Sequence, residues 1–174
     1  MKGEALRHDF GSGEVAAYRW INADGRAGGI VAESVTIADS AVIGCGASIG
    51  PEAIIGDGTI IGAYARIGDG TIIGAYARIG YRASIGDHVR IGDGDWYISG
   101  GPCGSRDAMW TAVHSREQGL RWWVGCQRGI STDALLERVQ ETHGDNEHAR
   151  AYRHAVQCVT THPEYLRRVA AQAE

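Results

Sequence analysis

The residues best suited to chemistry lie in the second half of the chain, where a glycine-rich run precedes a group of arginines and tryptophans. The run Gly100–Arg106 (GGPCGSR) combines free backbone N–H groups with a hydroxyl and a guanidinium. Proteins hold phosphates and other anions with these groups. Arginine and tryptophan together can also hold a phosphate and stack a base. The candidate ligand-binding residues are therefore Gly104, Ser105, Arg106, Trp110, Arg121, Trp122, Trp123 and Arg128.

The same segment has a purely structural interpretation. Alternation along the predicted strand at Leu120 sends one of Trp122 and Trp123 inward, and both can simply close the end of a neighbouring element. A glycine-rich loop is also expected where a chain leaves a regular repeat. Anion cradle and plain cap therefore both remain open.

Histidines and cysteines in this half suggest no metal centre and no nucleophile. His143, His148 and His154 are five and six residues apart, which places them on different sides of a helix, so we expect no metal ligands there. Cys103 and Cys126 have no evident activating histidine. The absence of a CxxC pair is typical of reduced thiols in a cytoplasmic protein, and the four cysteines are Cys45, Cys103, Cys126 and Cys158.

The candidate residues follow a segment in which one aliphatic residue returns at every sixth position. Neither a helix nor an ordinary strand has this period, whereas each unit of a hexapeptide β-helix supplies one short strand and one corner of a coil. A glycine follows each aliphatic residue from Ile43 to Ile91, and a small or β-branched residue comes four positions after each ladder residue from Val31 to Ile85. The ladder consists of Val31, Ile37, Ile43, Ile49, Ile55, Ile61, Ile67, Ile73, Ile79, Ile85 and Ile91.

The run IGDGTI IGAYAR IGDGTI IGAYAR IGYRAS IGDHVR resembles the hexapeptide-repeat (transferase-hexapeptide) superfamily. The resemblance covers residues 31–96 and implies a left-handed parallel β-helix with three hexads per coil, about 3.5 coils in all. It also implies a tendency to form homotrimers. Because this fold carries many unrelated chemistries, it fixes no activity by itself.

With three hexads per coil, the last residue of each hexad points outward on one of three faces. Isoleucine and valine side chains occupy two faces, and polar side chains occupy the third. An exposed apolar surface of this kind predicts a threefold assembly that buries the first two faces. The rows are Thr36, Ile54, Ile72 and Arg90; Val42, Ile60, Arg78 and Trp96; and Ser48, Arg66 and Ser84.

Segments on both sides of the repeats have other periods. The sequence predicts a loose lead-in over residues 1–13 and a capping hairpin, from Glu14–Ile21 and Arg26–Ala32. After the repeats it predicts a loop over Tyr97–Arg106, strands at Met109–His114 and Leu120–Cys126, and helices over Asp133–Thr142, from about 145 to Thr161, and from Pro163. The fold class is therefore mainly β: a left-handed parallel β-helix with an N-terminal hairpin cap and a C-terminal hairpin-plus-helices domain. The domains are residues 1–30, 31–98 and 99–174.

Acyl transfer is the activity that the superfamily resemblance implies most directly. Such enzymes use a histidine on the outside of the β-helix as general base. His88 is the one histidine within the hexads, at a corner position, and is the candidate catalytic residue. A solvated turn residue is the plainer interpretation, and the unbroken hexads favour a scaffold. A zinc site on the β-helix would need three histidines within the hexads, and the presence of only one excludes it.

The whole chain also resembles a group of small proteins encoded by bacteriophages and prophages. These share an entry motif before the hexads, matched in part by Gly28–Val31, and a tail with a HGDN segment followed by a tyrosine on a helix. The tail matches at Gly125-Cys126, Gly129, His143–Asn146 and Tyr152. The resemblance implies a phage setting, in which small host-signal binders form one class.

Composition sets the remaining bounds. The chain has 174 residues with a net charge of −4, so no electrostatic footprint for a nucleic acid polymer is present. It contains no long apolar run, and we expect neither secretion nor a membrane partner but a cytoplasmic location, the host bacterial cytoplasm if phage-encoded.

Together these features predict a non-catalytic homotrimer that binds or sequesters a small anionic, nucleotide-like ligand. In a phage setting this would be a sink for a host signalling nucleotide and a means of evading anti-phage defence. The alternatives are a CoA-dependent acyltransferase that uses His88 and a structural trimerisation module. No metal or cofactor is expected, with CoA entering only in the transferase alternative.

Overall fold

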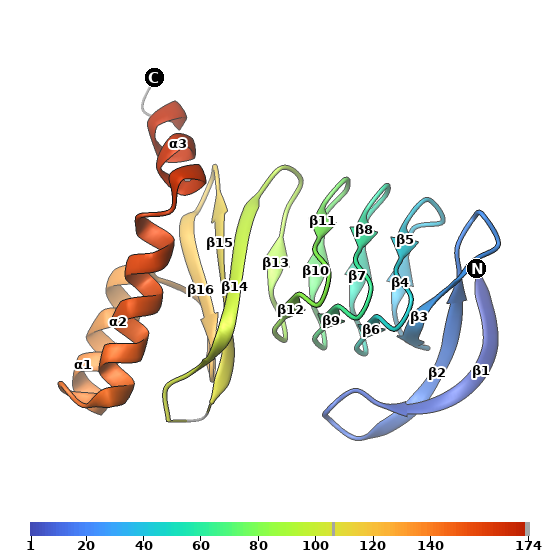
Figure 1. Ribbon diagram of the computed structural model, residues 1–174, viewed down its shortest axis with the longest axis horizontal. Coiled ribbons are helices and arrows are strands. Elements are labelled where there is room, and N and C mark those ends of the chain that lie inside the picture. Colours follow the sequence, from blue (N-terminus) through green and yellow to red (C-terminus); the bar gives the residue numbers. More distant parts are fainter. Residues whose placement is uncertain (106, 173–174) are drawn as a thin grey trace. The chain divides into compact units, whose positions relative to one another are not determined.

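The six-residue repeats form a parallel β-solenoid in the computed structural model, which describes residues 1–105 and 107–172 (Figure 1). The chain divides into two compact units, Met1–Gly94 and Asp95–Glu174. The first contains the solenoid and the second an antiparallel sheet with helices.

Each hexad contributes a strand of two residues, and equivalent strands stack in parallel 18 residues apart. The strands are β4 (Thr36–Ile37), β5 (Val42–Ile43), β6 (Ser48–Ile49), β7 (Ile54–Ile55), β8 (Ile60–Ile61), β9 (Arg66–Ile67), β10 (Ile72–Ile73), β11 (Arg78–Ile79), β12 (Ser84–Ile85) and β13 (Arg90–Ile91). The coils make about three turns and present three rows of strands, which run β3-β6-β9-β12, β4-β7-β10-β13 and β5-β8-β11. The predicted β-solenoid and its register are confirmed.

The aliphatic ladder residues fill the solenoid core, where they stack in one column for each of the three rows of strands. From Ile43 onward the ladder residues are at most 3% exposed, and the small residues beside them, such as Ala53 and Thr59, are fully buried. The glycines after the ladder residues are needed where successive coils approach: a Cβ at Gly56 would lie 2.7 Å from the backbone nitrogen of Ala75. Close-packed interiors of this kind leave no room for that atom.

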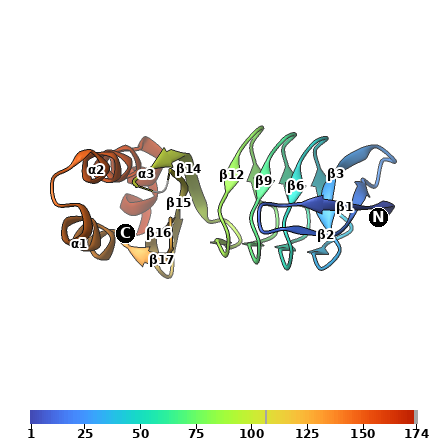
Figure 2. The same ribbon diagram turned by 90° about the horizontal axis from the view of Figure 1, so that it is seen from below.

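Two of the three rows carry exposed apolar side chains. Val42, Ile54 and Ile60 are 46%, 45% and 36% exposed, respectively, whereas the row of β6, β9 and β12 presents Ser48, Arg66 and Ser84. Figure 2 shows this third row in line with β3 (Ala27–Ala32). The row continues into β2 (Glu14–Ile21) and β1 (Lys2–Asp9), which pair in antiparallel fashion.

The predicted hairpin of residues 14–32 is present, but the prediction of a loose lead-in over residues 1–13 is wrong. Lys2–Asp9 pairs with β2 along its length, and Arg7 forms an ion pair with Glu14 at 3.0 Å. The lead-in has many polar side chains because this edge strand is largely exposed to solvent, and that composition resembles a loop.

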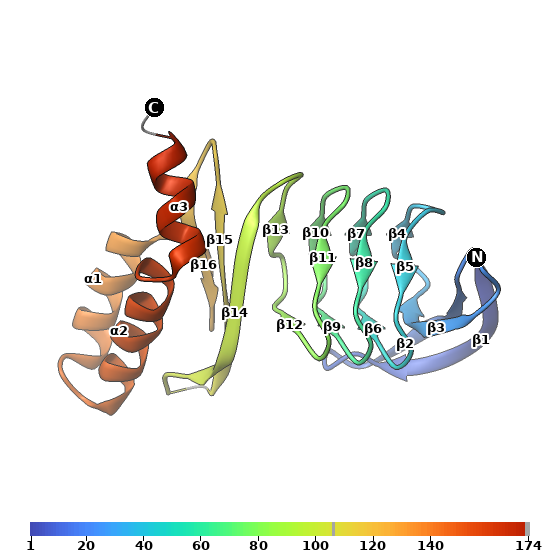
Figure 3. The same cartoon turned by 45° about the horizontal axis from the view of Figure 1, so that its top comes forward.

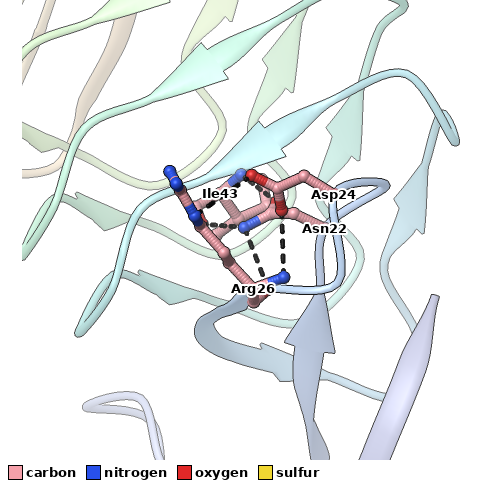
Figure 4. Close-up of polar contacts among 4 residues, drawn as sticks. All are labelled: Asn22, Asp24, Arg26 and Ile43. Carbon is pink, nitrogen blue, oxygen red and sulfur yellow. Dashed lines mark hydrogen bonds and ion pairs between the residues drawn. The ribbon is translucent and has the colours of Figure 1, made fainter.

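Asn22 covers the free edge of the row that begins with β5. Its Oδ1 accepts the N–H of Ile43 at 2.8 Å, and its Nδ2 donates to the carbonyl of Ile43 at 3.0 Å (Figure 4). Oδ1 also accepts the indole N–H of Trp20. A side-chain amide thus takes the place that backbone of an earlier coil would occupy, which satisfies both buried groups of the first strand.

The second unit is a four-stranded antiparallel sheet with helices packed on it (Figure 3). The strands are β14 (Trp96–Cys103), β15 (Ala108–Ser115), β16 (Gly119–Val124) and β17 (Gln127–Ser131), and the helices are α1 (Thr132–His143), α2 (Glu147–Thr160) and α3 (Pro163–Gln172). The core between sheet and helices includes Trp122, Val124, Leu135, Val156 and Val159.

Sequence reasoning predicted the helices and the two central strands and missed both edge strands. The predicted loop at Tyr97–Arg106 is wrong up to Cys103, because β14 pairs with β15 through that segment. β14 is an edge strand, where Gly100 and Pro102 are tolerated since one side of the strand needs no ladder hydrogen bonds. Among the described residues, no helix is long and apolar enough to cross a membrane.

Candidate functional site

The structure only partly supports the predicted anion-binding loop. Gly104 and Ser105 follow β14 in the turn toward β15, and Arg106 lies outside the described residues. Gly104 is buried with a φ of 72°, and the ring of Tyr152 lies against its Cα. Ser105 is exposed and lines a pocket.

The three candidate tryptophans are buried. Trp110, Trp122 and Trp123 are 9%, 1% and 8% exposed. Trp110 and Trp122 belong to the core under the helices, where their ring centroids are 5.7 Å apart, and the indole N–H of Trp122 donates to Thr132 Oγ1 at 3.0 Å. The buried rings of Trp110 and Trp122 therefore stabilise the second unit and are not exposed for stacking on a ligand.

The two candidate arginines of this region lie apart. Arg121 is half-buried on β16, on the face that alternation gives to Trp123 rather than to Trp122. Arg128 is exposed, and its Nη1 donates to the carbonyls of Gly125 and Gln127 at 2.8 and 3.3 Å. It therefore fixes the turn between β16 and β17.

A pocket of about 190 Å³ lies in the second unit, where the β16–β17 turn meets α1 and α2. The lining combines apolar side chains with two aliphatic hydroxyls, a thiol, a carboxamide, a guanidinium and two aromatic rings. Its lining consists of Ser105, Val124, Gly125, Cys126, Gln127, Leu135, Arg138, Val139, Thr142, His143 and Tyr152.

Helix α1 supplies one wall of this pocket through its periodicity. Leu135, Arg138, Val139, Thr142 and His143 are spaced by three and four residues and so lie on one helical face. The helix begins at the cap Ser131, whose hydroxyl accepts the N–H of Ala134.

The ends of α1 and α2 hold the two aromatic rings together. Gly144 ends α1 with a φ of 56°, and Asn146 caps α2 by accepting the N–H of Ala149 at 3.0 Å. Arg153 fastens this turn by donating to the carbonyl of Gly144 at 3.0 Å. As a result His143 stacks on Tyr152, with centroids 5.8 Å apart and planes 19° from parallel.

Polar side chains connect the rest of the pocket wall. Arg138 Nη1 donates to Oε1 of Gln127, and Gln127 Nε2 donates toward Sγ of Cys126 at 3.5 Å. Arg138 is exposed, so the guanidinium is reachable from solvent. The pocket thus presents a forked cation beside a pair of stacked rings.

Among the described residues, Ser105 is the one that the pocket lining shares with the binding residues predicted from the sequence. Arg138 and Gln127 were not selected, because nothing in the sequence joins a helix residue to a strand that was itself missed. A signal was present: the segments Gly125-Cys126, His143–Asn146 and Tyr152, which carry the phage-protein resemblance, contribute to the pocket or its supporting turn.

The remaining titratable candidates have other surroundings. Burial raises the pKa of the Cys103 thiol to about 11, so it is neutral at physiological pH and a poor nucleophile. Within the described part of the chain, no group of three histidine, cysteine or acidic side chains could hold a metal.

His88 lies at an exposed corner of the solenoid with a φ of 57°. Its ring covers Gly70 of the preceding coil: a Cβ on Gly70 would lie 2.9 Å from Cε1 of His88. Tyr76 covers Gly58 in the same way, so an aromatic ring over a glycine is a packing device of these corners. The neighbouring Asp87 uses Oδ1 to accept the N–H of Asp69.

Short parallel strands stacked in three rows define the first unit as a β-solenoid protein. Its repeats are of the hexapeptide type: residues 34–69 and 64–94 match the family model described as bacterial transferase hexapeptide (six repeats). Comparisons with curated proteins and with solved structures gave no match.

Proposed function

We propose that the protein binds a small anionic molecule in the pocket of the second unit and releases it chemically unchanged. The observation that carries the proposal is the position of Arg138, exposed on the pocket wall beside the stacked rings of His143 and Tyr152. A guanidinium binds carboxylates and phosphates through two parallel N–H donors. The hydroxyl of Ser105 and the amide N–H groups of the β16–β17 turn are further donors for the same anion.

The size of the pocket limits the ligand. At roughly 30 Å³ for each water in the liquid, a volume of about 190 Å³ corresponds to about six waters. This is enough for a phosphate or carboxylate and part of a ring, and a larger ligand would extend into solvent. A phosphorylated ring compound of nucleotide type fits this description, with its anionic group at Arg138 and its ring near Tyr152.

The proposal includes a homotrimer formed through the solenoid. Val42, Ile54 and Ile60 are exposed on two of the three faces, and exposed apolar rows mark protein–protein contacts. Proteins with hexapeptide repeats commonly form trimers. One pocket per subunit would then give three binding sites, which suits a protein that sequesters a ligand, such as a phage-encoded sink for a host signalling nucleotide.

Acyl transfer is the second candidate, because the matching family model describes bacterial transferases. His88 would be the general base and CoA the donor. The corner packing of His88 on Gly70 favours a structural role for this ring. A CoA thioester is also much larger than the pocket of the second unit.

One panel experiment separates these functions. The purified full chain is tested by thermal shift against nucleoside mono- and diphosphates, cyclic nucleotides, acyl-CoAs and small carboxylates, and the recovered ligand is analysed by mass spectrometry. A ligand that binds only the folded state raises Tm by an amount set by its concentration relative to Kd. We expect a nucleotide or carboxylate to raise Tm, to be recovered unchanged, and to lose its effect in Arg138→Ala.

The contrary results are equally specific. An effect confined to acyl-CoAs, with turnover that disappears in His88→Ala, would replace the binding proposal with the transferase. A panel without any effect would leave only the structural role of a trimeric rod.

A further inference from the structure

The side chain of Gln127 is hydrogen-bonded to the guanidinium of Arg138, the cation of the proposed binding pocket. Its carbonyl oxygen accepts a hydrogen bond from Arg138, and its amide nitrogen donates toward Cys126. All three residues line the pocket. The carboxamide of Gln127 therefore takes the position in which an anion bound by Arg138 would place an oxygen.

A carboxamide has the shape of a carboxylate without its charge. An amide oxygen is a weaker acceptor than an anionic oxygen, because hydrogen bonds to ionised acceptors are roughly twice as strong. Gln127 accepts from one N–H of the guanidinium, and an incoming anion offers that N–H a better partner. The exchange costs little, since Gln127 lies on the pocket wall and its amide can hydrogen-bond to solvent once displaced.

We infer that Gln127 is an internal placeholder for the anionic oxygen of the ligand and leaves Arg138 when the ligand binds. The inference rests on the proposed function and adds a selection rule to it. A ligand must supply an acceptor stronger than a carboxamide to displace Gln127. Phosphates and carboxylates meet this condition, whereas neutral molecules whose best acceptor is an amide or ketone oxygen do not.

The test titrates inorganic phosphate into the full chain and follows the arginine Nε–Hε signals by NMR. Removing the competitor in Gln127→Ala should tighten phosphate binding about two- to fivefold, the range expected for a solvent-exposed interaction with a charged group. Gln127→Glu places a permanent carboxylate on Arg138, and its charge also repels phosphate. Binding by this variant should be about tenfold weaker.

The second unit contains a matched control for these substitutions. Gln140, on α1, accepts through Oε1 from Arg153 of α2 at 2.5 Å, so it forms a similar glutamine–arginine contact, but it does not line the pocket. Gln140→Ala and Gln140→Glu should leave phosphate binding unchanged. Gln127→Asn, whose shorter side chain withdraws the carbonyl oxygen from Arg138 and weakens the contact, repeats the test of Gln127→Ala with a polar residue in place.

The outcomes separate the inference from the proposed function. Phosphate binding that is lost in Arg138→Ala but equal in wild type, Gln127→Ala, Gln127→Asn and Gln127→Glu would overturn the placeholder and leave the binding function standing. Signals that do not respond to phosphate in the wild type or in Gln127→Ala would overturn the proposed function itself. Tighter binding by both Gln127→Ala and Gln127→Asn, with weaker binding by Gln127→Glu, supports the placeholder.

Discussion

The phenol ring of Tyr152 lies directly against Gly104, in the space that a side chain at residue 104 would fill. Gly104 also has a φ of 72°, a conformation that L-residues with a Cβ adopt at a cost. One contact therefore joins the turn after β14 to helix α2 and sets the position of a ring that lines the pocket. The glycine is required for both its conformation and its lack of a side chain.

Gly104→Ala should destabilise the second unit by roughly 2–4 kcal/mol, the sum of a left-handed backbone penalty and overpacking against Tyr152. Phosphate affinity should also fall, because Tyr152 must move. Urea unfolding followed by tryptophan fluorescence measures the first effect. Gly101→Ala is the control, since a Cβ there meets no atom within 4 Å. Equal stability of both variants would contradict the account.

Asn22 should be the most sensitive polar residue of the N-terminal cap. Asn22→Ala leaves the N–H and carbonyl of Ile43 without partners and should cost about 2–4 kcal/mol, because each unsatisfied buried group costs roughly 1–3 kcal/mol. Asp24 is an exposed residue of the same turn; it accepts the backbone N–H of Arg26 and forms a solvent-exposed ion pair with the Arg26 guanidinium at 3.6 Å. Asp24→Ala should therefore change the free energy of unfolding by less than about 1 kcal/mol. A similar loss in both variants would show that Asn22 has no special role.

Assembly through the apolar solenoid faces predicts that charge disrupts the trimer in a position-dependent way. Ile54→Arg and Ile60→Arg place an unpaired cation in the proposed interface and should yield monomers. Ser84→Arg adds the same side chain to the polar row and should remain trimeric. Light scattering coupled to size exclusion gives the mass of each variant. A trimer in all three variants, or a monomeric wild type, would exclude this interface.

The coil length of 18 residues makes a further prediction about deletions. Removing residues 55–72 deletes one coil and leaves every later strand in its row, whereas removing residues 55–66 moves every later strand to the next row. The first variant should stay folded with a modestly lower Tm, but it removes both Ile60 and Ile72 from the outward rows and should weaken the trimer. The second loses Ile60 but places Ile72 outward at the same position, because residues 55–66 and 67–78 are identical in sequence, and it should remain trimeric. A more stable trimer in the first deletion than in the second would contradict the three-row register.

His114 should make the second unit less stable in acid. It is 3% exposed on β15 and meets the ring of Tyr165 edge-on at 5.3 Å. Burial, together with the nearby charge of Arg168, lowers its pKa below the ordinary 6.5, and Asp95 opposes this only in part. The unfolded chain therefore takes up a proton at His114 more readily than the folded chain does. The contribution of His114 to the free energy of unfolding is complete above about pH 6.5 and decreases as the pH falls below that value.

His114→Phe removes this proton uptake and should flatten the dependence of stability on pH between about 7 and 5. Urea unfolding of both proteins at several pH values measures the difference in slope. An unchanged slope in His114→Phe would show that another group governs the acid response.

How far the sequence predicts this protein depends on the range of the contacts involved. The ladder from Val31 to Ile91 predicts the solenoid, because a six-residue period leaves few other folds. The sequence does not predict the contact of Asn22 with Ile43, since the two residues are 21 positions apart and only the stacked coil brings them together. Helix α1 was predicted from local spacing, but the partner of Arg138 on β17 was not.

The same reasoning explains why the tryptophans were taken as ligand contacts. Trp122 follows Arg121 directly and Trp110 comes four residues after Arg106 in the sequence, yet alternation along β15 and β16 turns both tryptophans toward the helices. Burial of this kind depends on which face of the sheet the helices cover. That face is decided by α1 and α2 together, and no single segment of the sequence records it.

The binding account depends most directly on Arg138. The decisive measurement is a calorimetric titration of adenosine monophosphate, as a phosphate monoester with a ring, into the wild-type full chain and into Arg138→Ala. We predict saturable binding by the wild type, with one ligand per subunit, and at least about a tenfold loss in Arg138→Ala, the change expected for a charge-assisted hydrogen bond. Equal binding by both proteins, or no binding by the wild type, would contradict the assignment of this pocket as an anion site.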